Sequence, residues 1–275
     1  PMDCAKGIGI LATNAGPIQR YEGVDRIERP IPPLICIPTT AGTGADVSQF
    51  AIITDDERDS KMAIVSKAMV PDLALVDSET TLTMDAELTA CTGMDALVHA
   101  FEALASNASS PITSLWAMDA IPRVFEHLAA ATRELDNLEH RDAMMLASLE
   151  AGLAFSNASL GLVHAMAHPL GGYLDLPHGL CNALLLEQVV GYNYEHADYK
   201  QINDRLGIPS GAEALCGAIH ELREAVGLAG GLGAHGVTSE HLPRLADLAL
   251  ADPCVVTNPR RPSAAEVIEL YERTL

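Results

Sequence analysis

Two pairs of metal-binding residue types, each pair spaced four residues apart, constrain this chain more than any other feature. Asp95 and His99 form the first pair, and His164 and His168 form the second. Residues four apart lie on the same face of an α-helix, so each pair presents two donors to a common point. We therefore expect two helices that cross with their donor faces toward each other.

A fifth donor, His178, follows ten residues after His168. We expect Pro169, Gly171 and Gly172 to break the helix and let the chain turn back toward the same point. One carboxylate with several imidazoles suits Fe(II) or Zn(II) better than Mg(II) or Ca(II), which prefer oxygen ligands. The sequence predicts a transition-metal site, but the donors alone do not name the metal.

Composition limits the partners of the chain. Its 17 Lys plus Arg face 37 Asp plus Glu, and the formal net charge of −20 argues against binding to a nucleic-acid backbone. Six scattered cysteines without a CxxC pair favour a reducing, cytoplasmic environment over a disulfide framework. No apolar run approaches the ~18 residues of a membrane span, so we expect no membrane partner.

The character of the sequence changes near residue 84, where we place a domain boundary. Before it, a helix-like pattern at 4–10 precedes short β-branched runs separated by turns, which are typical of strands. After it, Ala, Leu, Met and Glu recur with helical spacing. The expected strands are 34–38, 50–54, 62–65 and 73–77, with a charged hairpin connection at 55–58. The expected helices are 86–105, 111–130, 138–157, 159–169, 179–192, 196–205, 211–227, 238–250 and 263–274.

Glycine-rich segments need separate interpretations. Residues 38–44 (Pro-Thr-Thr-Ala-Gly-Thr-Gly) follow a predicted strand and offer amide and hydroxyl donors to a phosphate or to the ribose–nicotinamide end of a dinucleotide; a plain strand-to-helix turn is equally consistent with them. Residues 231–236 match GxGxxG, but no strand precedes them, so we expect an interhelical loop. Gly7 and Gly9 lie within an apparent helix and indicate close packing. The helical acids Glu102, Asp119 and Glu150 are candidate acid–base groups, but we expect them to face solvent.

Three stretches closely resemble the iron-containing (group III) alcohol dehydrogenases: residues 93–100, 161–172 and 177–179. The resemblance extends over nearly the whole chain. It implies an α/β dinucleotide-binding domain that faces an all-helical metal-binding domain, the dehydroquinate synthase-like architecture. Residues 1–84 would then be the remaining C-terminal part of the α/β dinucleotide-binding domain, and residues 85–275 would be the all-α, metal-binding catalytic domain.

The resemblance also implies roles for individual residues. His168 would lie beside the nicotinamide as a candidate catalytic proton relay. The implied metal ligands are Asp95, His99, His164 and His178. The implied cofactor contacts are Asp3 at the pyrophosphate end, Thr39, Thr40 and Thr43, with Phe50 and Lys61 nearby.

The activity that follows from the resemblance is metal-dependent, NAD(P)-linked interconversion of a small primary alcohol and its aldehyde by hydride transfer. The implied cofactors are Fe(II), with Zn(II) as an alternative, and NAD(H), with NADP(H) not excluded. A sheet edge near residue 35 makes self-association a further expectation, and we expect a homo-oligomer.

Two alternatives remain open. The family's phosphate-binding turn reads Gly-Gly-Gly-Ser-Pro-x-Asp, and this chain begins at its proline as Pro1-Met2-Asp3, so we expect the nucleotide-binding half to be incomplete. The chain would then be a non-catalytic metal-binding or regulatory homologue, or an inactive fragment. The other alternative is a lyase or synthase on the related dehydroquinate-synthase-like scaffold, which uses the metal without net redox chemistry.

Overall fold

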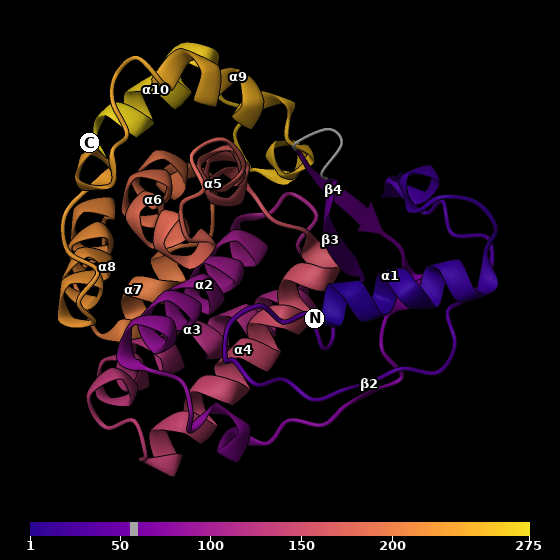
Figure 1. Cartoon of the computed structure of the whole chain (residues 1–275). Helices are drawn as coiled ribbons and strands as arrows, with labels where there is room; N and C mark the ends of the chain where they lie inside the picture. The colour runs from indigo at the N-terminus through magenta and orange to yellow at the C-terminus, as the bar shows by residue number, and fades with distance from the viewer. Residues whose placement is uncertain (56–59) are drawn as a thin grey trace.

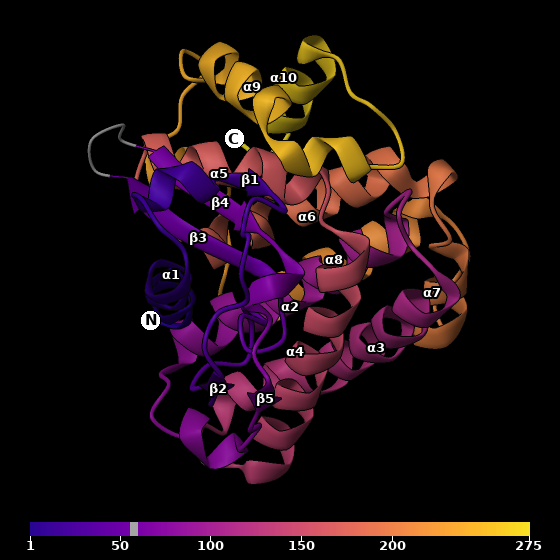
Figure 2. The same ribbon diagram turned by 90° about the vertical axis from the view of Figure 1, so that its right-hand side faces the viewer.

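The computed structural model describes residues 1–55 and 60–275. A small α/β part, indigo to purple in Figure 1, lies against a larger set of helices, and Figure 2 shows the same arrangement from the side. Of the charged hairpin connection predicted at 55–58, all but Asp55 lies outside the described residues.

The α/β part contains two small sheets. In the first, β4 pairs in parallel with β1 and antiparallel with β3; in the second, β2 and β5 pair in parallel. The elements of this part are α1 (Met2–Thr13), the 3₁₀ turn η1 (Ile18–Tyr21), β1 (Gly23–Val24), β2 (Ile35–Cys36), β3 (Phe50–Asp55), β4 (Ser60–Val65), η2 (Lys67–Met69), β5 (Leu73–Ala74) and η3 (Ser78–Thr81).

All four predicted strands are present, but β2 and β5 are shorter than expected, and the two-residue β1 was not predicted. The antiparallel β3–β4 pair confirms the hairpin. The second sheet leaves apolar side chains in solvent: Ile35 is 62% exposed, Leu73 is 51% exposed and Leu75 is 52% exposed. Within residues 1–55 and 60–275, β2 and β5 pair only with each other, so the edge near residue 35 is open, as expected.

Helix α1 packs closely on the first sheet, as its two glycines predict. A Cβ on Gly7 would lie 2.8 Å from Ile53 Cδ1, and a Cβ on Gly9 would lie 3.0 Å from Ile31 Cβ. Lys6, on the same helix, is fully buried; its Nζ donates to the Phe50 carbonyl oxygen at 2.9 Å. The helix is therefore fixed to β3 both by steric fit and by a buried amine.

The helical part holds the main hydrophobic core, and α9 and α10, yellow in Figures 1 and 2, cover one end of it. Its long helices α2, α3 and α4 pack on one another, and α6 lies against both α2 and α5. The helices are α2 (Ala86–Ala105), α3 (Pro111–Arg133), α4 (Leu138–Ala158), α5 (Leu162–Tyr173), α6 (His178–Asn193), α7 (Lys200–Leu206), α8 (Ala212–Ala225), α9 (Leu242–Ala251) and α10 (Ala264–Glu272). Short 3₁₀ turns join them: η4 (Tyr194–His196), η5 (Leu232–His235) and η6 (Pro253–Thr257).

Each predicted helix corresponds to an observed one, and the range 86–105 matches α2 at both ends. Helix α10 begins with a capping box built from Ser263 and Glu266. The GxGxxG segment forms the interhelical turn η5, as expected. These elements are readable because their signals are local: helical spacing, caps and the absence of a preceding strand.

The helix break expected at Pro169, Gly171 and Gly172 was predicted wrongly. Helix α5 does not stop at Pro169 but continues through Gly171 and Gly172 to Tyr173, and it ends with a bond from the Leu174 amide to the Leu170 carbonyl oxygen. A proline inside a helix removes one hydrogen bond, yet burial of Leu170 against the core holds the helix in place. The chain turns back only after Tyr173.

Among the described residues, no single helix is long and apolar enough to span a membrane; α4 and α5 meet the length and composition criteria only as a pair bent by 101°.

Candidate metal centre

Three helices bring four predicted ligands to one point. Asp95 and His99 lie on α2, His164 on α5, and His178 is the first residue of α6. Asp95 Oδ1 lies 3.7 Å from His99 Nε2, 3.7 Å from His164 Nε2 and 3.6 Å from His178 Nε2. The donor atoms of Asp95, His99 and His164 all lie within 4.8 Å of one another, a group that does not include His178.

These separations suit a first-row metal ion. Two ligands of one tetrahedral ion at bond lengths of ~2.0 to 2.2 Å lie about 3.3 to 3.6 Å apart, close to the separations of Asp95 Oδ1 from the three Nε2 atoms, whereas His178 lies outside the compact group of Asp95, His99 and His164. Three imidazole nitrogens and one carboxylate oxygen are donors that both Fe(II) and Zn(II) accept. The residues present therefore fit a divalent ion, although the distances do not choose between the two metals.

Hydrogen bonds to the far side of two rings fix which nitrogen faces the centre. His99 Nδ1 donates to the Gly42 carbonyl oxygen at 3.1 Å, and His164 Nδ1 donates to Glu102 Oε2 at 2.6 Å. With Nδ1 carrying the proton, Nε2 keeps its lone pair for a metal. The threonine-rich turn at 38–44 thus contacts the centre through Gly42, a role that its sequence did not suggest.

Asn182, one turn after His178 on α6, closes the remaining side of the donor group. Its amide nitrogen donates to Asp95 Oδ1 at 2.6 Å and lies 3.2 Å from both His164 Nε2 and His178 Nε2. The side chain is fully buried, and its Oδ1 has no hydrogen-bond partner among the described residues. The NH₂ group has two protons for these three contacts, and Asn182 Oδ1 is unpaired within the described residues, so a cation would complete the bonding here.

The protonation states differ among the four groups. Burial lowers the pKa of His99 to about 4 and that of His178 to about 3, in both cases against the attraction of Asp95. Burial also works against a proton on His164, but Glu102 and Asp95 outweigh it and raise its pKa to about 9. Burial would raise the pKa of Asp95, yet the surrounding imidazoles hold it well below its usual range. At neutral pH the rings of His99 and His178 are therefore uncharged and can bind a metal directly, whereas a metal must displace a proton from His164.

His168 lies beside this donor group and has a different partner. Its ring is stacked on that of His178 with centroids 5.6 Å apart, and its Nδ1 lies 2.7 Å from Asp252 Oδ2. Asp252 itself caps the turn η6, where its Oδ1 accepts from the Cys254 amide at 2.8 Å. A histidine oriented by a carboxylate presents Nε2 as its free nitrogen, which is the arrangement a proton carrier needs.

Four of the six predicted cofactor contacts share one cavity of about 860 Å³ between α1, β3 and the turn at 38–44; they are Asp3, Thr39, Thr40 and Thr43. The other two are not among the residues that line it. Phe50 packs on Phe155 with ring centroids 5.7 Å apart, and Phe155 stacks on His99 at 4.3 Å. Lys61 is exposed, and its Nζ lies 3.5 Å from the position of a Cβ on Gly171 of α5.

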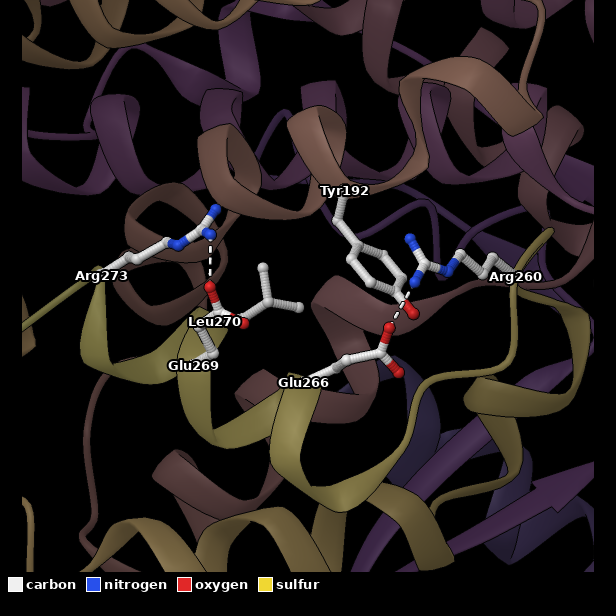
Figure 3. A pocket seen from close by; sticks show the side chains of 6 residues that line it. All are labelled: Tyr192, Arg260, Glu266, Glu269, Leu270 and Arg273. Atoms are coloured by element: carbon white, nitrogen blue, oxygen red, sulfur yellow. Dashed lines mark hydrogen bonds and ion pairs between the residues drawn. The ribbon is translucent and has the colours of Figure 1, made fainter.

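A second, smaller pocket of about 200 Å³ lies between α6 and α10 (Figure 3). The Arg260 guanidinium lies 4.2 Å from the centre of the Tyr192 ring and pairs with Glu266, while Arg273 pairs with Glu269 at 2.5 Å. Each arginine is neutralised by its own glutamate, so this pocket offers no free cation to a ligand.

The sequence failed to identify several residues at the centre. Glu102 was expected to face solvent, and this was wrong, because it is 4% exposed and bonded to His164. It follows Asp95 by seven residues, so the helical stripe that contains Asp95 and His99 already included it. Asn182 could also have been predicted, because it follows His178 by four residues and so shares a helical face with it. Asp252 had no such signal, because its partner is 84 residues away.

Comparisons with known proteins identify the family of the chain. Residues 89–275 match the model of the Fe-containing alcohol dehydrogenase family, C-terminal, and residues 1–78 match the iron-containing alcohol dehydrogenase model. The chain is 44% identical to alcohol dehydrogenase 4 of Schizosaccharomyces pombe, over 99% of this chain and 66% of that protein. It is 35% identical to the NAD-dependent methanol dehydrogenase of Bacillus methanolicus, over 99% of this chain and 74% of that protein.

A solved structure gives the same result. The crystal structure of a 1,3-propanediol oxidoreductase superposes with a TM-score of 0.97 at 38% identity, covering all of this chain and 74% of that one. An α/β segment against a helical domain with a carboxylate–imidazole donor group fits a metal-dependent enzyme, and the relatives named above are dehydrogenases. The chain belongs to the iron-containing alcohol dehydrogenase family, and the resemblance and fold class expected from the sequence are confirmed. It spans 66% to 74% of the length of these relatives.

Proposed function

We propose that the chain carries the metal-binding and catalytic part of an NAD(P)-linked oxidoreductase that interconverts a small primary alcohol and its aldehyde. The observation that carries the proposal is Asp95 Oδ1 within 3.6 to 3.7 Å of three imidazole Nε2 atoms. Relatives named for methanol and for 1,3-propanediol support a small alcohol as substrate. The name of the methanol dehydrogenase supports NAD as the dinucleotide.

In this proposal Asp95, His99, His164 and His178 hold a divalent ion, with Fe(II) favoured by the family and Zn(II) compatible with the donors. When bound, the ion supplies Lewis acidity toward the alcohol oxygen, and the nicotinamide exchanges the hydride. Three neutral imidazoles and one carboxylate leave positive charge on such a site, which favours an anionic oxygen there.

The remaining roles belong to side chains around the donors. His168, held at Nδ1 by Asp252, carries the hydroxyl proton to or from solvent through Nε2; its side chain is 24% exposed, so water can reach it. The cavity lined by Asp3 and by the threonines of the 38–44 turn holds part of the dinucleotide. Phe155, stacked on His99, excludes water from the buried side of the donors.

Histidine substitutions test the assignment. His178→Ala should lose bound metal and activity together, whereas His168→Ala should keep its metal and lose turnover rate. His220→Ala, which replaces a half-exposed histidine on α8, is the matched control. Metal content by mass spectrometry and NADH formation with ethanol or 1,3-propanediol provide the two readouts. Full metal retention in His178→Ala would contradict the ligand set.

A second candidate is a metal-binding homologue without turnover, and it is favoured by Phe50 and Lys61, two predicted cofactor contacts that do not line the cavity of Asp3 and the threonines. Titration with NADH, followed by its fluorescence, separates the two. Micromolar binding by the metal-loaded chain supports the oxidoreductase. Bound metal without any NADH binding supports the homologue that lacks turnover.

A further inference from the structure

We propose that Glu102 is a positioning residue of the metal centre, which both orients His164 and fixes the start of the helix that carries it. This inference rests on the proposed metal site and extends it to a residue that does not touch the ion. Glu102 lies on α2, seven residues after Asp95, and faces the start of α5.

The two carboxylate oxygens of Glu102 accept hydrogen bonds from different groups. Oε2 accepts from His164 Nδ1 at 2.6 Å, while Oε1 accepts from the amides of Val163 at 2.5 Å and His164 at 3.3 Å. The first amides of a helix have no partner within it, and Gly161, the residue before α5, has no side chain to cap them. The carboxylate therefore joins the backbone of α5 and the His164 ring to α2, the helix of Asp95 and His99.

The carboxylate of Glu102 is buried, and the backbone before α5 approaches it closely. Glu102 is 4% exposed and His164 is 1% exposed. A Cβ on Gly161 would lie 3.1 Å from Glu102 Oε1 and 3.1 Å from Asn258 Oδ1, so glycine at this position lets the carboxylate approach the helix. Asn258 Oδ1 accepts from the Leu162 amide at 3.2 Å, so two side chains together cap the start of α5.

A carboxylate does what an amide cannot do here. All three groups around Glu102 are N–H donors, and a carboxylate accepts from all of them at once. A glutamine would direct its NH₂ either at His164 Nδ1 or at the Val163 amide. In the first case the His164 proton moves to Nε2, the nitrogen that would face the metal; in the second, two donors oppose each other.

The test uses the full chain and Zn²⁺ alone as the probe, with affinity measured by competition with a chromophoric chelator. Glu102→Gln should bind zinc about 10- to 100-fold more weakly than the wild type, as expected when the group that orients a ligand is lost. Glu87→Gln, which removes an exposed carboxylate from the same helix, should bind zinc like the wild type.

Melting of the metal-free proteins separates positioning from a purely structural role. A Glu102→Gln protein that melts earlier but binds zinc with wild-type affinity would overturn the proposal. If the variant does not fold, ¹⁵N NMR of the zinc-loaded wild type decides: His164 must keep its proton on Nδ1, and a proton-free Nδ1 would overturn the proposal.

The proposed function fails in a distinguishable way. If the wild type binds no zinc, or if His178→Ala binds it equally well, the metal site itself is wrong. If zinc binding depends on His178 but not on Glu102, only the positioning role is wrong.

Discussion

A single methyl group at the start of α6 should weaken the metal centre, because the helix touches α2 there through backbone atoms. Gly179 follows His178, and a Cβ at this position would lie 2.4 Å from the Cys91 carbonyl oxygen and 2.8 Å from its carbonyl carbon. Real Cβ atoms essentially never come within 3.0 Å of such a neighbour and are rarely closer than 3.4 Å, so Gly179→Ala requires the two helices to separate by roughly 0.6 to 1.0 Å. Both atoms it meets belong to the α2 backbone, which cannot rotate away.

This displacement is large compared with the tolerance of a binding site, which is about 0.5 Å. It would move His178 away from Asp95 on the opposing helix. We expect zinc affinity to fall on the order of 10- to 100-fold, as when the geometry of a metal ligand is disturbed. Forcing a methyl group into a filled contact costs about 1 to 3 kcal/mol. For a chain of this size, that lowers the melting temperature by roughly 2 to 12 °C.

Gly172→Ala is the matched control. Gly172 lies near the end of α5, its φ is not positive, and no atom lies within 4 Å of the position of an added Cβ. Alanine there should leave zinc affinity unchanged and stabilise the helix by about 0.5 to 1 kcal/mol. Calorimetry and chelator competition give both quantities. A Gly179→Ala protein that matches Gly172→Ala in both would refute the reasoning from the Cys91 contact.

Two further predictions concern stability away from the centre. Burial, reinforced by Asp119, raises the pKa of Glu150 to about 7, so between about pH 4.5 and 7 the folded state holds a proton that the unfolded state has lost. The free energy of unfolding should therefore fall by up to about 3 kcal/mol as the pH rises through this range. In urea titrations, Glu150→Gln should lose this dependence on pH. Lys6→Met removes the amine that donates to the carbonyl oxygens of Ser48 and Phe50. The free energy of unfolding in urea should fall by about 1 to 3 kcal/mol for each acceptor left unpaired. An unchanged unfolding midpoint would contradict the assigned contacts.

Much of the fold was predictable because its signals lie within a few residues. The helical spacing and the change of composition placed every helix from α2 to α10, and the range 86–105 was correct at both ends. Short β-branched runs separated by turns predicted β3 and β4, which pair antiparallel. The prediction failed where burial opposed the rule that proline ends a helix. Pro169 lies inside α5 because the buried Leu170 holds this part of the helix against the core.

At the candidate site, too, some residues could be predicted from local sequence patterns and others could not. Asp95 with His99, and His164 with His168, were recognisable because residues four apart share a helical face whatever surrounds the helix. The same rule, carried one turn further, reaches Glu102, but only packing shows that this carboxylate is buried beneath α5.

The sequence by itself therefore determined which donors lie together on each helix and which family the chain resembles. Only the tertiary structure decided that α2, α5 and α6 meet with four donors around one point, that Gly42 and Glu102 orient two of the rings, and that Asp252 holds His168. The physical reason is distance along the chain. Helical periodicity acts over one or two turns, whereas these contacts join residues 57 to 84 positions apart and depend on how the helices cross.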